Sequence, residues 1–450
     1  MLPVCSLFLS FSSCGSFAQQ MLDNFTSNFT GTNSSTAKIG DNTNLTNAAD
    51  YRKPSVNKNT PIATVSYMGG VYDVYSDHHA ELKSVQLLYK QFIKLVIPSE
   101  LNYDYETYKV TVVRAKACEG DDSQHSLRAL IIGDNVREIG DRAFAGNAML
   151  NDVVFNDNLE IIGDEAFSGC HSLTSVKMSG ALRYIGKSAF SSYSNYLMSI
   201  DLSKADKLEY VGDGAFYRGN TSDKYPVSLP NSIKYIGKKA FYNSECVNIP
   251  ENVEIIDEEG LPLKGATWIL PISLKSVGKQ AFGSRGWAEK SELIIPDGTM
   301  MKELDISYFP SCVLIKMGRG IKKVKGTVNY LKEKSNLRTI KLSPTLEEID
   351  DNCFDGIEYL SSVMGLDDCD VLKRIGNRAF YGSNIEFITI PESVIEIGEQ
   401  AFENSKKLRN VKFNGHPNVI KKGAFAYCPL LQQPSVPDGT ILEKGVFFNP

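Results

Sequence analysis

The chain has 450 residues, of which 42% are hydrophobic and 22% are charged, a composition typical of a folded globular protein. Its formal net charge is -5 and no stretch is rich in lysine and arginine, which argues against nucleic-acid binding. The nine cysteines form no close pairs, so their spacing predicts no disulfide framework.

The first eighteen residues predict an export signal. Residues 2–18 carry no charge and include an apolar run at residues 7–11; the segment is long enough for a signal-peptide core but too short and Ser-rich for a membrane span. Residues 16–18, Ser-Phe-Ala, match a cleavage site for a plain secretory signal. Alternatively, the Phe-Ser-Ser-Cys of residues 11–14 resembles the lipobox of Bacteroides-type lipoproteins, which implies lipidation of Cys14. Both alternatives place the protein outside the cytosol, secreted or at the cell surface or outer membrane, with a lipid anchor as the one expected membrane contact.

Two segments separate this signal from the rest of the chain. Residues 19–60 are rich in Asn, Thr and Ser and show no hydrophobic period, so they predict a disordered tether. Residues 93–98 and 108–113 are strand-like runs. Because a solenoid needs its first turn covered, residues 61–112 are expected to form an N-terminal capping unit.

A six-residue phrase recurs through residues 113–450. A clear copy is Ile139-Gly-Asp-Arg-Ala-Phe144, and other copies keep Ile or Val first, Gly second and Ala-Phe last. Repetition at roughly 20–26 residues predicts a solenoid in which each turn contacts its neighbours. The phrase decays in residues 283–353, and the sequence leaves open whether these are degenerate turns or an insertion. The other full or partial copies end at Phe167, Phe190, Phe216, Phe241, Leu261, Phe282, Phe354, Phe380, Phe402, Phe425 and Phe447.

Each period also contains a short strand-like segment, as in Val227-Ser-Leu-Pro230, whose first and third residues should point inward and whose middle residue should point outward. The Ile and Phe of the phrase are expected in the core, and Gly is expected to allow a bend with positive φ. The third residue after each Phe is often small or polar. These residues are expected to form a buried ladder that satisfies backbone groups: Asn147, Cys170, Ser244, Ser383, Ser405 and Cys428.

Residues 385–402 read IEFITIPESVIEIGEQAF and resemble, without gaps, the pattern of BspA-like leucine-rich repeats of the Treponema pallidum type. The resemblance covers residues 113–450. It implies an α/β repeat solenoid, a leucine-rich-repeat arc of about fourteen turns with short parallel strands on one face and irregular or short helical segments on the other. Family members are mostly cell-surface or secreted proteins of host-associated bacteria and some protozoa. The resemblance therefore implies binding to host matrix proteins or other cells, and the repeat implies no enzymatic activity.

No sequence motif indicates a catalytic, phosphate-binding or metal site. Only one pair of histidines is adjacent, His78-His79, and neither HExxH nor a Cys-x-x-Cys pair with metal spacing occurs. The acidic runs at residues 257–259, 350–351 and 367–370 are interpreted as solvated turns, with a cation site as the less favoured alternative. We therefore predict a protein that is not an enzyme and needs no cofactor or metal.

The candidate ligand-binding residues are the outward middle residues of the strands, together with two nearby tryptophans. The central part of this column is apolar, which indicates either a partner site or degenerate turns that pack on a neighbouring loop. The first functional hypothesis is adhesion or protein–protein recognition through the strands. The alternative is glycan binding as an accessory of a surface nutrient-uptake system, with Trp268, Trp287 and Tyr308 as candidates. The predicted ligand-binding residues are Lys177, Asp201, Ser228, Asn248, Ile269, Ile294, Lys341, Thr389, Lys412, Trp268 and Trp287.

Overall fold

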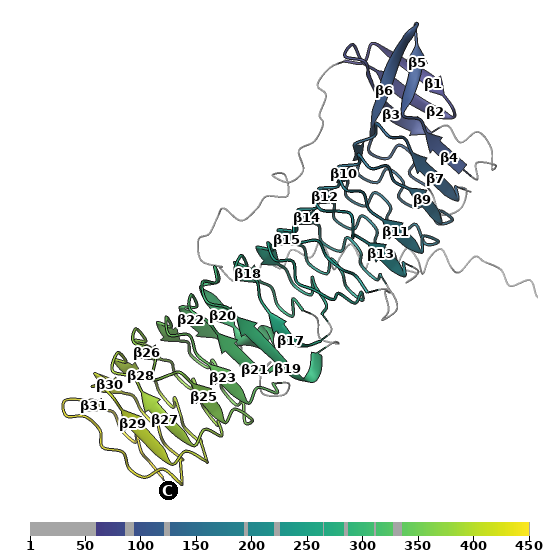
Figure 1. Cartoon of the computed structure of the whole chain (residues 1–450). Helices are drawn as coiled ribbons and strands as arrows, with labels where there is room; N and C mark the ends of the chain where they lie inside the picture. The colour runs from purple at the N-terminus through teal and green to yellow at the C-terminus, as the bar shows by residue number, and fades with distance from the viewer. Residues whose placement is uncertain are drawn as a thin grey trace, which may run out of the picture. The chain divides into compact units, whose positions relative to one another are not determined.

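The computed structural model describes residues 60–85, 94–120, 127–192, 197–219, 226–263, 265–282, 287–309, 312–326 and 335–449. The predicted export signal, the Cys14 lipidation site and nearly all of the predicted tether lie outside these residues. Residues 51–450 form one compact unit, in which successive turns of the chain stack by parallel strand pairing (Figure 1). The unit has about 13 turns, close to the fourteen predicted, so the solenoid prediction is confirmed.

The first set of strands contains the predicted strand-like segments. These strands pair in parallel in several short runs. Between two of the runs, isolated parallel β-bridges join Val227 to Cys246 and Cys246 to Leu263. They are β4 (Lys94–Ile97), β7 (Ala129–Ile132), β9 (Asp152–Val154), β11 (Ser175–Lys177), β13 (Ser199–Asp201), β17 (Gly265–Ile269), β19 (Trp287–Ile295), β21 (Cys312–Met317), β23 (Thr339–Lys341), β25 (Ser362–Met364), β27 (Phe387–Ile390) and β29 (Asn410–Phe413). We call their outward side the strand face.

The second set of strands contains the start of the repeated phrase. Most of its members are two residues long and also pair in parallel from turn to turn, in one run up to β18 and another from β20. We call this set the second ladder. It comprises β8 (Glu138–Ile139), β10 (Ile161–Ile162), β12 (Tyr184–Ile185), β14 (Tyr210–Val211), β15 (Tyr235–Ile236), β16 (Ile255–Ile256), β18 (Ser276–Val277), β20 (Glu303–Asp305), β22 (Lys323–Lys325), β24 (Glu348–Ile349), β26 (Arg374–Ile375), β28 (Glu396–Ile397), β30 (Val419–Ile420) and β31 (Ile441–Leu442).

Helix is almost absent from the described residues, which hold a single 3-10 helix, η1 (Ile306–Tyr308). The side opposite the strand face is therefore built from turns and short strands. Pairing also answers the question that the sequence leaves open about residues 283–353. Because β19 pairs with β21 and β20 with β22, the described part of this region consists of degenerate turns of the same solenoid.

Five strands precede the first complete turn. They are β1 (Ala63–Tyr67), β2 (Gly70–Val74), β3 (His79–Val85), β5 (Glu100–Tyr103) and β6 (Glu106–Val113). The first three form an antiparallel meander, β3 then pairs in parallel with β6, and β6 pairs with β8 of the second ladder. Through the pairing of β6 with β8, these strands lie against the N-terminal edge of the second ladder.

The core is a stack of phenylalanine rings. Phe144, Phe167, Phe190, Phe216 and Phe241 are buried, and successive ring centroids lie 5.2 to 5.3 Å apart. A second stack runs from Phe354 to Phe447, with centroids 5.0 to 5.6 Å apart. The Phe of the phrase therefore fills the interior from turn to turn, as the repeat predicts.

The glycine of the phrase has a different role from the one predicted. Positive φ occurs two residues later, directly before Ala, as at Arg378 (φ 53) and Gln400 (φ 56). A Cβ on Gly398 would instead come within 2.5 Å of the backbone atoms Asn377 N and Gly376 C of the preceding turn. Glycine is therefore favoured because two backbones approach closely, and the prediction of a positive φ at this position was wrong.

This contact predicts that Gly398→Ala destabilises the protein by about 1–3 kcal/mol, because the clash is with backbone atoms that must shift. Lys421 occupies the same position one turn later. The distance from its amide nitrogen to the Ile397 carbonyl oxygen is 3.0 Å, compared with 2.8 Å from the Gly398 nitrogen to the Ile375 oxygen. Lys421→Ala is the matched control and should cost at most about 1 kcal/mol, for the loss of one half-buried ion pair with Glu396. Urea denaturation of both variants measures the difference, and equal effects would contradict the clash.

The predicted buried ladder is present. The Nδ2 of Asn147 donates to the carbonyls of Cys118 and Phe144 at 2.7 and 2.9 Å. Cys170 and Cys428 direct Sγ to the carbonyl of the preceding phrase Phe, at 3.4 and 3.2 Å. Ser405 donates to the Phe380 carbonyl at 3.3 Å. Each of these side chains satisfies a buried carbonyl of the neighbouring turn, so the ladder connects turns as well as closing its own bend.

Candidate ligand-binding surface

The structure places most of the predicted residues on the strand face. Alternation holds along the strands, because each outward residue lies between inward neighbours; Lys177, for example, is exposed between the buried Val176 and Met178. The exposed members are Lys177, Ser228, Ile269, Lys341 and Lys412, and the half-buried members are Asp201, Ile294 and Thr389. Turn-to-turn pairing aligns them, as for Lys177 with Asp201 and Thr389 with Lys412.

Asn248 is not an outward residue in the predicted register. Its turn pairs through Cys246, which is buried opposite Val227, so Val247 takes the outward position and is 49% exposed. Asn248 lies one residue further on, where its amide accepts from Leu229 N and donates to Leu229 O at 2.8 Å each. The prediction of Asn248 as a free ligand-binding side chain was wrong, because its amide replaces a strand hydrogen bond.

The aromatic candidates also change. Trp268 is 8% exposed and belongs to the core, because its neighbour Ile269 takes the outward position on β17. The prediction that Trp268 contributes to an exposed face was therefore wrong. Tyr308 is half-buried and packs against the core from η1. The side chain of Trp287 lies outside the described part of the structure, so its proposed role stays a prediction.

Two apolar groups occupy the strand face. The central group comprises Val247, Ile269, which is 62% exposed, and the half-buried Ile294. The second group comprises Met364 and Phe387, which are 50% and 66% exposed on β25 and β27. The second group was not among the predicted residues, because the prediction used one outward residue per strand. Phe387 is the other outward residue of its strand, a position that the same alternation could have identified.

Charges on the second ladder are paired across turns. Arg374 joins Glu348 at 2.9 Å and Glu396 at 3.3 Å, and Lys421 continues the chain of charges to Glu396 at 2.8 Å. The hydrogen bond from Lys421 is the main cause of the lowered pKa of Glu396, and Arg374 adds to it. Further inter-turn pairs along this side include Arg137–Glu160, Arg183–Glu209, Lys234–Glu209, Lys275–Glu254, Lys322–Glu347, Lys323–Glu348 and Lys325–Glu303.

Several carboxylates of the phrase hold the next turn and are not simply solvated. Asp141 accepts from the amide of Asp164, Asp164 from Lys187, and Asp351 from Asn377, each at 2.8 Å. Burial alone would raise the pKa of Asp351, but the Asn377 amide and the Arg374 guanidinium lower it below its ordinary value. The interpretation of the acidic run at residues 350–351 as a solvated turn was therefore too simple, because Asp351 connects adjacent turns of the solenoid.

The lysines of the strand face contrast with this arrangement. Within the described residues, neither Lys341 nor Lys412 has a carboxylate within 4.0 Å. Lys316, which sequence analysis did not select, lies opposite Lys341 and reaches Glu292 at 3.7 Å. Many charged side chains along the second ladder are thus paired across turns, whereas Lys341 and Lys412 on the strand face have no ion-pair partner within the described residues.

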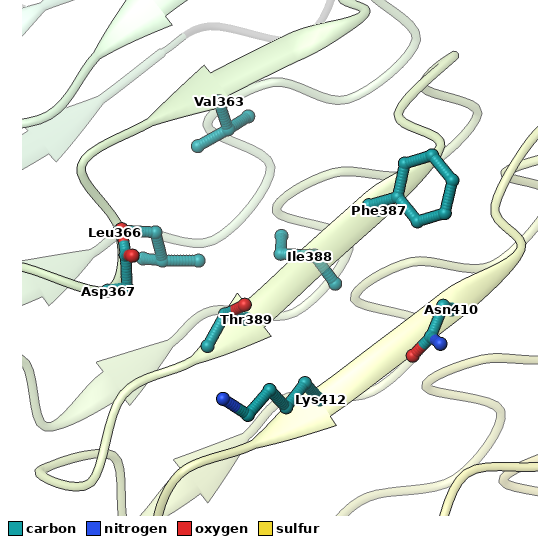
Figure 2. Close-up of a pocket in the computed structure, with 8 residues that line it drawn as sticks. All are labelled: Val363, Leu366, Asp367, Phe387, Ile388, Thr389, Asn410 and Lys412. Carbon is teal, nitrogen blue, oxygen red and sulfur yellow. The ribbon is translucent and has the colours of Figure 1, made fainter.

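A hollow of about 390 Å³ lies on the strand face over β25, β27 and β29 (Figure 2). It contains two of the predicted residues, Thr389 and Lys412, and one member of the acidic run at 367–370, Asp367. Figure 2 shows the Lys412 side chain extending past Thr389 toward the side on which Asp367 lies. The complete lining is Val363, Leu366, Asp367, Phe387, Ile388, Thr389, Asn410 and Lys412.

The described cysteines are unsuited to nucleophilic chemistry. Seven of them, Cys428 included, are buried free thiols, and burial raises the pKa of Cys428 to about 11. A thiol with this pKa is almost entirely protonated at neutral pH and reacts slowly. We expect the Cys428 peptide to stay unlabelled by N-ethylmaleimide at pH 7 in the native protein and to be labelled in urea, as read by peptide mass mapping. Native labelling within minutes would contradict this placement.

The described residues also offer neither a metal cluster nor a membrane-spanning helix. Among those the structure describes, no cluster of three or more His, Cys, Asp or Glu has the arrangement to hold a metal ion. In the same part of the chain, no helix has the length and apolar character needed to cross a membrane. The surface feature that remains is the strand face, with its exposed lysines, apolar groups and hollow.

The turn architecture agrees with comparisons to known proteins. The family model described as "BspA type Leucine rich repeat region" matches residues 122–248, 222–317, 264–373 and 327–450. The chain belongs to this family. None of the curated proteins matches this BspA-type chain.

Three solved structures are similar to this chain. A leucine-rich repeat protein of Bacteroides ovatus is 22% identical, with 84% of this chain and 99% of that chain covered at a TM-score of 0.56. A leucine-rich cell surface protein of Faecalibacterium prausnitzii is 16% identical over 85% and 97% of the two chains, with a TM-score of 0.39. The pneumococcal vaccine antigen PcpA is 17% identical over 85% and 88%, with a TM-score of 0.34. The first of these supports the BspA-type solenoid fold.

Proposed function

We propose that this BspA-type chain is a non-catalytic binding protein that recognises a protein ligand through its strand face. The observation that carries the proposal is that ion pairing differs between the two sides of each turn. Ion pairs connect neighbouring turns along the second ladder, whereas Lys341 and Lys412 of the strand face have no partner in the described residues. Exposed apolar groups lie on the same face, and exposed apolar patches surrounded by polar residues are typical of protein interaction sites.

The proposed location is the cell surface or the medium around the cell. The export signal of residues 1–18 supports it, through either cleavage after Ala18 or lipidation of Cys14. The tether of residues 19–60 would let the solenoid work away from its anchor. We further propose that residues 61–112 cap the first turn, since β6 pairs with β8 and protects its strand edge. Host matrix proteins and the surfaces of other cells are the proposed partners.

Binding to immobilised fibronectin, laminin and collagen, measured by surface plasmon resonance, tests the proposal. We expect one of these proteins or an intact host cell to bind, and we expect Lys341→Ala and Lys412→Ala each to weaken binding roughly five- to tenfold, since one desolvated charge is worth about 1 kcal/mol or more. Lys373→Ala is the control, because Lys373 is an exposed lysine beside the second ladder. Absence of binding to all of these probes, or an equal loss with Lys373→Ala, would overturn the proposal.

A further inference from the structure

The hollow over β25, β27 and β29 has the composition of a small-ligand site. Ile388 and Leu366 are buried at its floor, and Val363 beside them is half-buried although its turn-to-turn partner Ile340 is completely buried. The hollow thus reaches the edge of the core at this point. Its volume of about 390 Å³ lies within the range of ordinary ligand pockets. We propose that it binds one uncharged sugar residue of a glycan, a ligand class distinct from the protein partner proposed above.

The outward side chains of β27 and β29 form a regular platform. Phe387 lies opposite Asn410 and Thr389 lies opposite Lys412, in parallel register. Residues two apart on a strand are separated by about 6.6 Å, and neighbouring strands by about 4.8 Å. Four side chains at this spacing match the dimensions of a single six-membered sugar ring, which would contact all four at once (Figure 2).

The chemistry of the lining fits a polyhydroxylated ring. The ring of Phe387 is 66% exposed and offers an aromatic surface to the C–H face of a sugar. Around it, Asp367 accepts hydrogen bonds, Lys412 donates them, and Asn410 and Thr389 do both. Vicinal hydroxyl groups also donate and accept, so a sugar can satisfy all four groups together. A peptide side chain such as Leu or Glu would leave most of them unpaired.

The charged residues in and beside the hollow favour an uncharged ligand. The hollow contains one cation, Lys412, and one anion, Asp367, so its lining has no net charge. Asp368 and Asp370 follow in the same loop and are exposed, which adds negative charge beside the site. An anionic ligand such as a sialylated glycan or an acidic peptide would be repelled by these carboxylates. A cationic ligand would be repelled by the ammonium of Lys412, which lines the hollow.

A printed array of neutral and sialylated oligosaccharides, followed by calorimetric titration with the strongest neutral oligosaccharide, tests the assignment on the full chain. We expect neutral glycans to bind, Phe387→Ala to weaken binding at least tenfold and Asp367→Asn at least fivefold. Phe448→Ala is the matched control, because Phe448 is 51% exposed outside the hollow, and its binding should stay within twofold of the parent. Unchanged melting temperatures of the variants would show that folding is intact.

Three outcomes overturn the assignment: no binding on the array, binding restricted to sialylated glycans, or full affinity in Phe387→Ala. The result is separable from the protein-binding proposal through Lys341→Ala, because Lys341 does not line the hollow. This substitution should weaken the matrix-protein interaction and leave the sugar titration unchanged. Failure of sugar binding with an intact Lys341-dependent protein interaction would remove the sugar site alone.

Discussion

Replacement of Phe380 by alanine is expected to destabilise the C-terminal turns by about 3–5 kcal/mol, the usual cost of removing a buried aromatic side chain. The Phe380 ring is fully buried between those of Phe354 and Phe402, with centroids 5.0 and 5.1 Å away. Its loss removes hydrophobic burial and two aromatic contacts, and it leaves a cavity that parallel strands on both sides hold open. Because turns of a solenoid contact their neighbours alone, the effect should be concentrated near this turn.

Hydrogen exchange of the native protein measures this local effect, with urea denaturation as the global readout. Peptides from residues 349–425 should lose protection, while those of the first turns, such as residues 139–190, should change little. Phe387→Ala is the control, since the same residue type is 66% exposed seven positions later and should change stability by no more than about 0.5 kcal/mol. A loss below about 1 kcal/mol for Phe380→Ala would contradict the stacked core.

Arg114→Ala is expected to cost about 3 kcal/mol and to loosen the N-terminal strands from the solenoid. The guanidinium of Arg114 binds Asp73 at 2.7 Å and Glu81 at 2.5 Å, and the side chains of these carboxylates are 3% and 10% exposed. Removing the arginine leaves two carboxylates buried without their main cationic partner, which is the costly way to break an ion pair. Arg137→Ala is the control, because Arg137 is 63% exposed in its pair with Glu160 and should cost at most about 1 kcal/mol.

Urea denaturation and exchange of residues 63–85 would measure the two arginine variants side by side. Selective loss of protection in β1, β2 and β3 of Arg114→Ala is the expected pattern. Comparable stability of the two variants would show that the Asp73–Arg114–Glu81 cluster does not hold the capping strands.

The same cluster predicts the response to acid. Burial alone would raise the pKa of Asp73, but the hydrogen bond from Thr64 and the charges of Arg114 and Lys83 outweigh it, so the pKa lies below its ordinary value of 3.8. A carboxylate with a lowered native pKa stabilises the fold above its unfolded pKa, and this stabilisation is lost as the pH falls through the native pKa. We expect the melting temperature to decline below about pH 4. Asp73→Asn should reduce this dependence, and an unchanged acid profile would contradict the assignment.

Much of the fold was predictable because a phrase that recurs in phase has one physical solution. Ile139, Ala143 and Phe144 are buried in one turn, and the equivalent apolar residues are buried in most other turns, so the period predicts most of the core. The buried ladder, formed by the third residue after each Phe, was predictable because buried carbonyls must be satisfied. The second ladder was less visible, because two residues are too few to show strand alternation. Its alternating charges, Arg137, Glu160, Arg183 and Glu209 in successive turns, were a signal that the sequence did contain.

The site was less predictable, since it depends on register and local spacing. Cys246 and Val247 are both apolar, so the pattern could not decide which of them points inward, and Asn248 was misplaced as a result. The hollow depends on how β25 and β27 are spaced, which no motif in the sequence records, although alternation alone could have identified Phe387 as an outward residue. The role of the phrase glycine depends on a contact between neighbouring turns and was invisible within a single turn.

Hydrogen exchange of the solenoid with a bound matrix protein tests the central claim, that ligands bind the strand face and not the second ladder. Peptides containing β23, β25, β27 and β29 should gain protection in the complex. Those containing β24, β26, β28 and β30 of the same turns should exchange as in the free protein. Protection confined to the second ladder, or spread equally over both sides, would contradict the account.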